Sequence, residues 1–238
     1  MPFSETDISL LRASSLLRGV PDHPLIDEAL RRRENQLLLA AETVFLPAGV
    51  CNPGLYLVAH GTVELLASTR EGGEKIVEFV RAGGLFGEET LFGSYPCLYA
   101  ARTITPVAVL HLPESTVDQW LVAMPRFARR LMGILAERTD YVEKDVVTFC
   151  TKSAAARLVC YLVCQFNKAP VTPDGSLSLN ITLPRNKLAS RLGVSDSHLS
   201  RAFNELERQG LIVKRRGGIL IPDVQALSRY VCPAGCDW

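Results

Sequence analysis

One stretch, from Thr182 to Ile221, constrains the fold of this 238-residue chain more than any other. Within it, residues 185–192 carry apolar side chains at helical spacing, and Gly193 then interrupts the period. A second amphipathic run follows from Asp196 to Gln209. Two helical periods separated by so short a break predict two helices joined by a tight turn.

The second of these predicted helices has the composition of a helix that reads DNA. Ser195 stands at the N-cap position, where its hydroxyl can accept an orphan backbone N–H group. Leu199, Phe203 and Leu206 then face inward, and hydrogen-bonding side chains face outward near the helix N-terminus. This arrangement is typical of a recognition helix that contacts base edges in a major groove.

A basic β-hairpin is predicted directly after this helix. Leu211–Val213 and Ile219–Ile221 are short β-forming runs, and the segment 214–218 between them contains three cations and two glycines. An ordinary pair of amphipathic helices is the alternative, but it does not account for the N-cap, the polar face and the cationic hairpin together. The pattern predicts a winged helix-turn-helix that binds double-stranded DNA. The residues expected to contact DNA are Arg185, Lys187, Ser195, Ser197, His198, Ser200, Arg201, Lys214, Arg215 and Arg216.

The distribution of charge agrees with a C-terminal DNA-binding region. Up to residue 150 the chain has 14 Lys and Arg against 19 Asp and Glu, a net charge of −5; beyond it the numbers are 12 and 6, a net charge of +6. A basic module is attracted to the phosphate backbone. Because no membrane span or signal peptide is visible, a cytoplasmic protein with free cysteines is expected.

The N-terminal half is predicted to begin with two short helices, over Ser4–Leu17 and Pro24–Leu39. Between Thr43 and Leu112, short β-forming runs are separated by glycines. Regular short strands with turn signals between them indicate an antiparallel sandwich or jelly roll. The expected fold class is therefore α+β, with a β-roll in front of the winged helix-turn-helix.

A long helix is predicted between these two regions. Pro113 opens a helical region, and Pro125 begins the long helix itself. From Ala128 onward, seam residues follow the alternating four- and three-residue spacing of a coiled coil. The expected dimer contacts are Met132, Leu135, Thr139, Val142, Val146 and Phe149. A homodimer is favoured because a two-fold protein matches a two-fold DNA site. Three domains are expected: N-terminal helices and a sensor roll over 1–112, a dimerisation helix over 113–150 and the DNA-binding domain over 151–238.

This order of elements resembles the CRP/FNR superfamily of bacterial transcription regulators across nearly the whole chain. The matching positions are Gly49, Leu55, Tyr56, Gly61, Val63, Gly72 or Gly73, Glu74, Gly84, Phe86, Gly87, Glu88, Ala100, Gly193, Val194, Ser195, Ser200, Arg201, Leu206, Gly210, Leu211 and Ile212. The resemblance implies a transcription regulator, expected to be an activator that contacts RNA polymerase. No nucleophile motif or phosphate-binding loop points to an enzyme.

The resemblance also implies how the recognition helix reads its site. Arg201 matches the arginine with which the family reads a guanine, and Ser200 matches the serine before it. Three residues before Ser200, many relatives have a glutamate that accepts from cytosine, but this chain has Ser197. The half-site is therefore expected to keep a guanine opposite Arg201 and to differ beside it.

An effector site between the roll and the long helix is a further implication of the resemblance. Its expected residues are Phe86, Gly87, Glu88, Leu98, Tyr99 and Ala100. The cyclic-AMP branch has Gly-Glu followed, ten residues after the Glu, by Arg-Ser-Ala, whose Arg and Ser hold the cyclic phosphate. Here Leu98-Tyr99-Ala100 stands at that place, and without a cation a buried phosphate charge is uncompensated. We therefore expect an effector other than cyclic AMP.

Two further branches differ in their cofactor. The iron–sulfur branch needs cysteines near the N-terminus, and none precedes Cys51. The lost phosphate site and the segments 96–101 and 153–159 resemble most the branch that activates denitrification genes in response to nitric oxide, which makes haem a candidate cofactor. The candidate axial ligands are His60, His111, Cys51, Cys97 and Pro2.

A second interpretation needs no gas sensor. A transcription factor of the same fold can be active as made, or can be controlled by oxidation of a thiol such as Cys97 or Cys164. DNA affinity that does not change with gases, nucleotides or redox state would favour this alternative.

Overall fold

The computed structural model describes residues 3–50, 54–69, 73–92, 96–166, 175–180, 183–215 and 218–231. The chain forms two compact units, residues 1–140 and 141–238. Their boundary falls inside the long helix α4 (Pro125–Thr151), whereas the sequence predicts a domain boundary near residue 150. None of the helices in the described parts of the chain is long and apolar enough to cross a bilayer.

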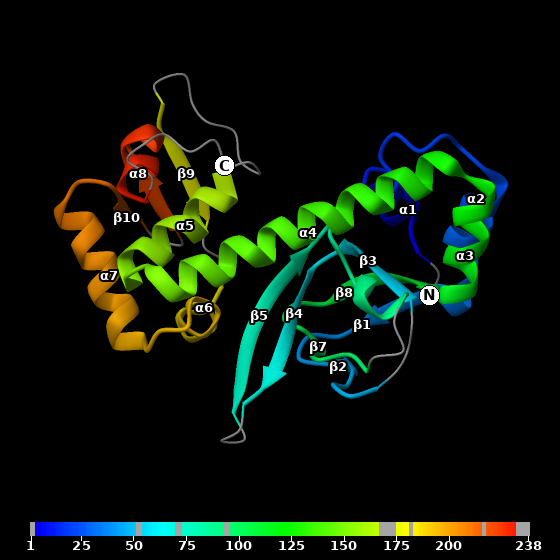
Figure 1. The fold of residues 1–238 in the computed structure, drawn as a ribbon, viewed down its shortest axis with the longest axis horizontal. Helices are drawn as coiled ribbons and strands as arrows, with labels where there is room; N and C mark the ends of the chain where they lie inside the picture. Colours follow the sequence, from blue (N-terminus) through cyan, green and yellow to red (C-terminus); the bar gives the residue numbers. More distant parts are fainter. Residues whose placement is uncertain are drawn as a thin grey trace. The chain divides into compact units, whose positions relative to one another are not determined.

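Two antiparallel four-stranded sheets form the core of the first unit (Figure 1). One sheet has the strand order β1-β8-β3-β6, and the other has the order β2-β7-β4-β5. The strands are β1 (Gln36–Leu39), β2 (Val44–Leu46), β3 (Gly54–His60), β4 (Thr62–Ser68), β5 (Glu74–Arg81), β6 (Leu85–Phe86), β7 (Ala100–Thr103) and β8 (Val107–Pro113). The predicted antiparallel roll and the α+β class are confirmed.

Strand β3 shows how the two-residue period organises this unit. Leu55, Leu57 and Ala59 pack into an apolar cluster with the helices, whereas Tyr56 and Val58 pack into the cluster between the sheets. Because both faces are covered, the strand is an almost continuous apolar run.

The N-terminal helices differ from the prediction in their lengths. Helix α1 (Glu5–Arg12) is capped by Ser4 and is shorter than predicted, and α2 (Pro24–Arg31) is followed by the short 3-10 helix η1 (Arg33–Asn35). The prediction of a helix over Gln36–Leu39 is wrong, because this segment is strand β1, paired with β8. A short apolar run carries no decisive period, and pairing with β8 satisfies its backbone groups.

Two helices follow the roll. Helix α3 (Glu114–Ala123) buries Val117 and Trp120 against the roll. Helix α4 begins at Pro125, as predicted, and buries Phe127, Leu131 and Ile134. No residue of α4 beyond Ile134 is buried, so the remainder of this helix presents side chains that are half-buried or exposed.

The second unit is a winged helix-turn-helix. Its helices after α4 are α5 (Ala154–Phe166), α6 (Arg185–Leu192), α7 (Asp196–Arg208) and α8 (Val224–Val231). Its sheet has the order β10-β11-β9, from β9 (Leu177–Asn180), β10 (Val213–Arg215) and β11 (Gly218–Ile221). Leu158 and Leu162 of α5 pack with Leu199 of α7 and Leu227 of α8. The predicted helices are confirmed, and so is the presence of a hairpin, but its first strand is Val213–Arg215 rather than Leu211–Val213, so Lys214 and Arg215 are strand residues. Helix α8 is an addition that the sequence did not predict.

Candidate nucleic-acid interface and effector pocket

The turn between α6 and α7 has the geometry that the sequence predicts. Helix α6 ends at Gly193, whose φ of 64° is left-handed, and the Val194 N–H donates to the Ala189 carbonyl. Helix α7 begins after Ser195, whose hydroxyl accepts the His198 N–H at 3.3 Å. The predicted turn and N-cap are confirmed, and they set the direction in which α7 leaves α6.

Helix α7 has one apolar and one polar face. Leu199, Phe203 and Leu206 are buried in the core of the second unit, as predicted. The exposed side chains of its N-terminal half are Asp196, Ser197, His198 and Arg201. A row of hydrogen-bonding side chains on the exposed face of a helix whose opposite face is packed in a core is the geometry of a recognition helix.

Arg185 of α6 contacts α7. Its Nη2 donates to the Ser200 hydroxyl at 3.1 Å, and its guanidinium lies 5.4 Å from the centre of the Phe203 ring. Ser200 in turn donates to the Asp196 carbonyl at 2.9 Å, so this hydroxyl is used within the helix. Arg185 remains exposed and Lys187 is half-buried, which suits both to the phosphate backbone rather than to base edges.

The wing also contacts α7. Lys214 Nζ lies 2.6 Å from Asn204 Oδ1 and 2.8 Å from Glu207 Oε2, and hydrogen bonding to Lys214 lowers the pKa of Glu207. Lys214, predicted as a DNA contact, is therefore engaged with the recognition helix. Arg215 is exposed, and Arg216 lies outside the described residues.

The sequence pattern did not predict the burial of Arg191 in α6. Its side chain is 7% exposed, and it donates to the Tyr141 hydroxyl and, at 2.6 Å, to Asp145 Oδ2, both in α4. Burial opposes the charge, but these two acceptors raise the pKa of Arg191. Arg157 of α5 holds the same end of α4 by donating to the Phe149 carbonyl at 2.8 Å. No local signal points to these contacts, because the partners of Arg191 lie 46 and 50 residues earlier.

The structure brings most of the predicted effector-pocket residues together. Phe86 is completely buried and Tyr99 is 8% exposed, and the Gly87 N–H donates to the Tyr99 hydroxyl at 3.2 Å. Ala100 is half-buried at the start of β7. Leu98, in contrast, is 84% exposed, so it does not share this enclosed position. The phenol of Tyr99 thus occupies space beside the Gly87 backbone.

Glu88 is the buried acid of this region. It is 5% exposed, and its Oε1 lies 3.3 Å from Arg138 Nε of α4. Arg138 also pairs with Glu78 of β5. Burial raises the pKa of Glu88 to about 7, although the charge of Arg138 opposes this shift. Glu88 Oε2 has no hydrogen-bond partner among the described residues, so this carboxyl is only partly satisfied.

Arg102 does not supply the missing phosphate-binding cation. Its Nε lies 2.7 Å from the buried Glu64 and its Nη1 lies 2.9 Å from Glu74. These strands pair so that Glu64 of β4 stands opposite Arg102 of β7. The cation is therefore committed to carboxylates of its own sheet.

The described histidines do not face a common haem site. His60 Nδ1 lies 2.8 Å from the Asp7 carboxylate, so this ring is engaged with α1. His111 stacks on Tyr56 with ring centres 4.4 Å apart, and its buried Nε2 lies beside Gly54 without a hydrogen-bond partner among the described residues. His111 of β8 pairs opposite Tyr56 of β3. Tyr56 lies four residues from His60 along this strand, a distance of about 13 Å.

Of the other haem-ligand candidates, only Cys97 lies within the described residues. Cys97 is 2% exposed, its thiol donates to Glu89 at 3.7 Å, and burial raises its pKa. Pro2 and Cys51 lie outside the described residues. Within the described ranges, no group of three or more His, Cys, Asp or Glu side chains is placed to hold a metal ion. Of the described candidates, His60 and Cys97 are already engaged with Asp7 and Glu89.

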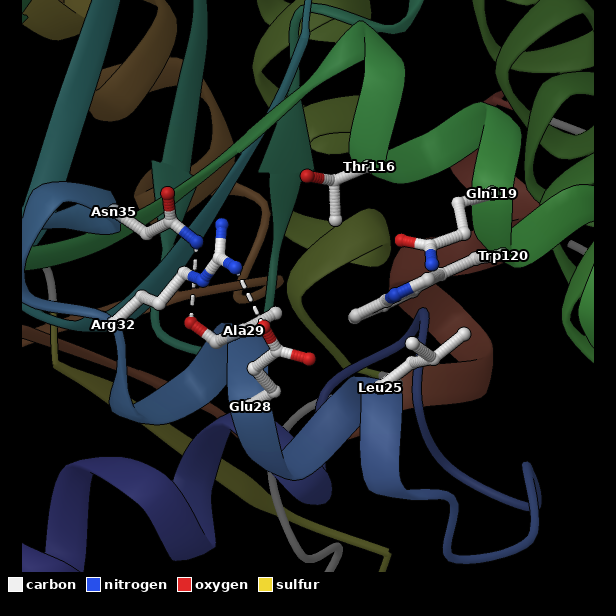
Figure 2. A pocket seen from close by; sticks show the side chains of 8 residues that line it. All are labelled: Leu25, Glu28, Ala29, Arg32, Asn35, Thr116, Gln119 and Trp120. Atoms are coloured by element: carbon white, nitrogen blue, oxygen red, sulfur yellow. Dashed lines mark hydrogen bonds and ion pairs between the residues drawn. The ribbon is translucent and has the colours of Figure 1, made fainter.

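A separate depression lies between α2 and α3 (Figure 2). Its lining residues are Leu25, Glu28, Ala29, Arg32, Asn35, Thr116, Gln119 and Trp120. Arg32 and Glu28 pair with each other at 2.5 Å, and the buried Trp120 Nε1 has no partner in the part of the chain that the structure describes. This depression contains none of the side chains predicted for the effector.

The predicted dimer seam is open to solvent over much of its length. Met132, Val142 and Val146 are 62%, 49% and 56% exposed, which is high for apolar side chains on a regular helix. Leu135 and Phe149 are half-buried and Thr139 is exposed. Phe149 lies 5.3 Å from the guanidinium of Arg157, so it also contributes to packing within its own chain.

Two family models match the chain in the regions of these sites. The model described as "Crp-like helix-turn-helix domain" matches residues 156–230, and that described as "Cyclic nucleotide-binding domain" matches residues 36–123. The transcriptional regulator SdrP of Thermus thermophilus is 28% identical over 198 residues, which cover 82% of this chain and 93% of SdrP. The fumarate and nitrate reduction regulatory protein of Shigella dysenteriae is 23% identical over 208 residues, covering 86% and 80%.

Solved structures agree with this fold. A CRP/FNR-family transcriptional regulator from Thermus thermophilus superposes with a TM-score of 0.62 at 25% identity, covering 82% of this chain and 97% of that chain. FixK2 from Bradyrhizobium japonicum has the same fold, with a TM-score of 0.71 at 20% identity and coverage of 84% and 98%. These relatives do not single out a nitric-oxide-responsive branch.

Proposed function

We propose that this chain acts as a homodimeric activator on two-fold-symmetric DNA sites. It belongs to the CRP/FNR superfamily of DNA-binding transcription regulators, which are not enzymes. The observation that carries the proposal is α7, whose polar face is exposed while its opposite face is buried. The exposed apolar side chains Met132, Val142 and Val146 of α4 supply the dimer seam. RNA polymerase is the expected partner of the DNA-bound dimer.

Arg201 is proposed to read a guanine in each half-site. A guanidinium can donate to guanine O6 and N7 together, and Arg201 is exposed on the polar face of α7. Arg185, Lys187 and Arg215 are assigned to phosphates, where they position the helix without selecting a sequence. Binding of this kind weakens steeply as the salt concentration rises.

The test is selection of bound sequences from a random DNA pool, followed by fluorescence anisotropy with the selected duplex and a shuffled duplex. We expect a two-fold-symmetric site with half-sites about one helical turn apart, bound roughly a thousandfold or more tightly than the shuffled DNA. Equal affinity for both duplexes at several salt concentrations would overturn the proposal.

For the effector pocket, we propose that cyclic AMP is not the ligand. Tyr99 and Leu98 stand where the cyclic-AMP branch has a serine and an arginine, and Arg102 is committed to Glu64 and Glu74. The cation beside the pocket, Arg138, is paired with Glu78 and Glu88, so a cyclic phosphate would have to displace these carboxylates. Isothermal titration with cyclic AMP should show no binding at millimolar nucleotide, and a stoichiometric heat would contradict this assignment.

A ligand-independent regulator is the second candidate, and the contacts of the pocket favour it. Arg138 of α4 already pairs with Glu88 and Glu78, and Tyr99 already accepts the Gly87 N–H. Control by nitric oxide through haem rests on the resemblance of sequence segments alone. The gas sensor is tested by the absorption spectrum of the protein offered haem, with DNA binding measured before and after nitric oxide. A shifting Soret band coupled to DNA affinity supports the gas sensor. Unchanged binding removes it and leaves an organic ligand, thiol oxidation or constitutive binding, and DNA affinity that also stays constant with nucleotides and redox state favours ligand independence.

A further inference from the structure

Asn204 has a position on α7 that the proposed function does not use. It is exposed and lies three residues after Arg201. Ser197, Ser200, Arg201 and Asn204 have the spacing i, i+3, i+4 and i+7, which places them in one stripe along a helix. Homeodomain recognition helices present their base-contacting residues with this same spacing.

The wing holds the amide group of Asn204 in one orientation. Lys214 Nζ lies 2.6 Å from Asn204 Oδ1 and is held there by Glu207 at 2.8 Å. A lysine ammonium can only donate, so the amide must present its oxygen to Lys214. Both N–H groups of Nδ2 are then left to point away from the lysine. Lys214 takes one of the two acceptor positions of Oδ1, which biases the side chain towards donating.

The place of Asn204 along the helix suits a neighbouring base pair. Each helical residue advances by about 1.5 Å, so Asn204 lies about 4.5 Å beyond Arg201 along the axis of α7. Base pairs are spaced by about 3.4 Å. A side chain one turn beyond the guanine-reading arginine therefore reaches the next base pair or the one after it.

We propose that Asn204 is a further sequence-reading residue, and that Lys214 of the wing sets its specificity by occupying its amide oxygen. The inference rests on the proposed docking of α7 in a major groove. A free asparagine recognises adenine by donating to N7 and accepting from N6. With its oxygen bonded to Lys214, Asn204 loses the paired contact that singles out adenine and acts as a donor, so it accepts guanine, adenine or thymine, each of which presents an acceptor in the major groove, and it disfavours cytosine, which presents only a donor.

The experiment measures anisotropy on a series of duplexes derived from the selected site. Each of the two base pairs that flank the guanine contacted by Arg201 is changed to all four bases. The wild type should prefer guanine, thymine or adenine over cytosine at one of these positions by about two- to tenfold, the range of one ordinary hydrogen bond, and should not favour adenine over guanine. Asn204→Ala should remove this preference and keep the preference for the Arg201 guanine.

Two further variants separate the role of the wing from loss of the side chain. Asn204→Asp keeps an oxygen for Lys214 and loses both donors, so it should lose the same preference as Asn204→Ala. Lys214→Met frees the amide oxygen to accept from adenine N6, so adenine should become the preferred base at that position. Gln209→Ala removes an exposed amide just beyond the end of α7 and serves as the matched control, with binding unchanged for all duplexes.

The outcomes that overturn the inference are distinct from failure of the proposed function. If the wild type discriminates at the Arg201 guanine but shows no preference at either flanking position, Asn204 reads nothing. The inference is also overturned if Asn204→Ala weakens binding to all four bases by one common factor. If the wild type does not distinguish the selected from the shuffled duplex, the proposed function itself fails, and this inference fails with it.

Discussion

The guanidinium of Arg191 in α6 lies 2.6 Å from the carboxylate of Asp145 in α4, although Arg191 is almost completely enclosed. The Tyr141 hydroxyl accepts a second hydrogen bond, and the ring of Phe149 lies 6.0 Å from the guanidinium. The last turns of α4 are therefore held to the helix-turn-helix by a charged contact, which agrees with a unit boundary before Tyr141.

Removing Arg191 should destabilise the second unit. We expect Arg191→Met to lower the free energy of unfolding by about 3 kcal/mol, because an acceptor and a partly buried carboxylate lose their cation. Asp145 is 31% exposed, so Asp145→Asn should cost less. Urea denaturation of both single variants and the double variant gives the coupling energy. Arg185→Met removes an exposed cation from the same helix, with its solvent-accessible contacts to Ser200 and Phe203, and should cost clearly less than Arg191→Met. Equal losses for both arginines would contradict the buried contact.

The buried Glu88 should make stability depend on pH. Its pKa is about 7 in the folded chain and 4.5 when exposed, so the folded state binds more protons between these values. The contribution of Glu88 to stability is therefore greatest below pH 4.5 and is lost as the pH rises to about 7. Glu88→Gln should raise the unfolding free energy at pH 8 by up to about 3 kcal/mol, the equivalent of this shift. Thermal unfolding from about pH 4.5 to pH 8 checks this, and parallel pH curves for both proteins would contradict it.

Gly87 is required by both its conformation and its surroundings. Its φ is 93°, and a Cβ there would lie 2.5 Å from the Gly54 carbonyl oxygen. Gly83 has a similar φ of 82° but has nothing within 4 Å of a Cβ. Both substitutions to alanine incur backbone strain. Only Gly87→Ala adds the clash, so it should cost about 1–3 kcal/mol more than Gly83→Ala in chemical denaturation. Equal losses of stability for the two variants would show that the backbone at Gly54 moves to relieve the clash.

The α4 seam should control assembly. Val142→Glu places a charge in the predicted coiled-coil seam, and sedimentation should show a shift from dimer to monomer at micromolar protein. The monomer should also bind the two-fold DNA site far more weakly. Val122→Glu is the matched control, since Val122 is 87% exposed on α3 and is not part of the seam. Dissociation by both variants, or by neither, would count against the seam.

Arg201 and Arg215 should affect DNA binding in different ways. Arg201→Ala should cost roughly 1–3 kcal/mol on the selected site and little on shuffled DNA, because a base contact is lost. Arg215→Ala should weaken all sequences similarly and reduce the salt slope by about 0.9, the equivalent of one phosphate contact. Anisotropy on both duplexes across a salt series measures both effects. A similar loss on both duplexes for Arg201→Ala would remove its assignment as a base reader.

The helix-turn-helix and the roll are largely determined by local sequence. Gly193 ends α6 because glycine accepts a left-handed φ, and Ser195 caps α7 because its hydroxyl can reach the backbone N–H of His198 in the first turn. The glycine-separated β-runs and the start of α4 at Pro125 were predictable for the same reason. In each case the signal and the structure it determines lie within a few residues.

Tertiary structure decided the features that depend on distant partners. Gln36–Leu39 is a strand because β8 lies beside it, and Arg191 is buried because Asp145 stands opposite, 46 residues earlier. Tyr99 is enclosed whereas Leu98 is exposed, and Lys214 is bound to Asn204. The local spacing of apolar and polar residues predicts neither arrangement. Local sequence specifies backbone conformation, because the energies of helix caps and of backbone φ angles depend on residues that are close together in the chain. Burial and pairing of polar side chains depend on which segments the fold brings together.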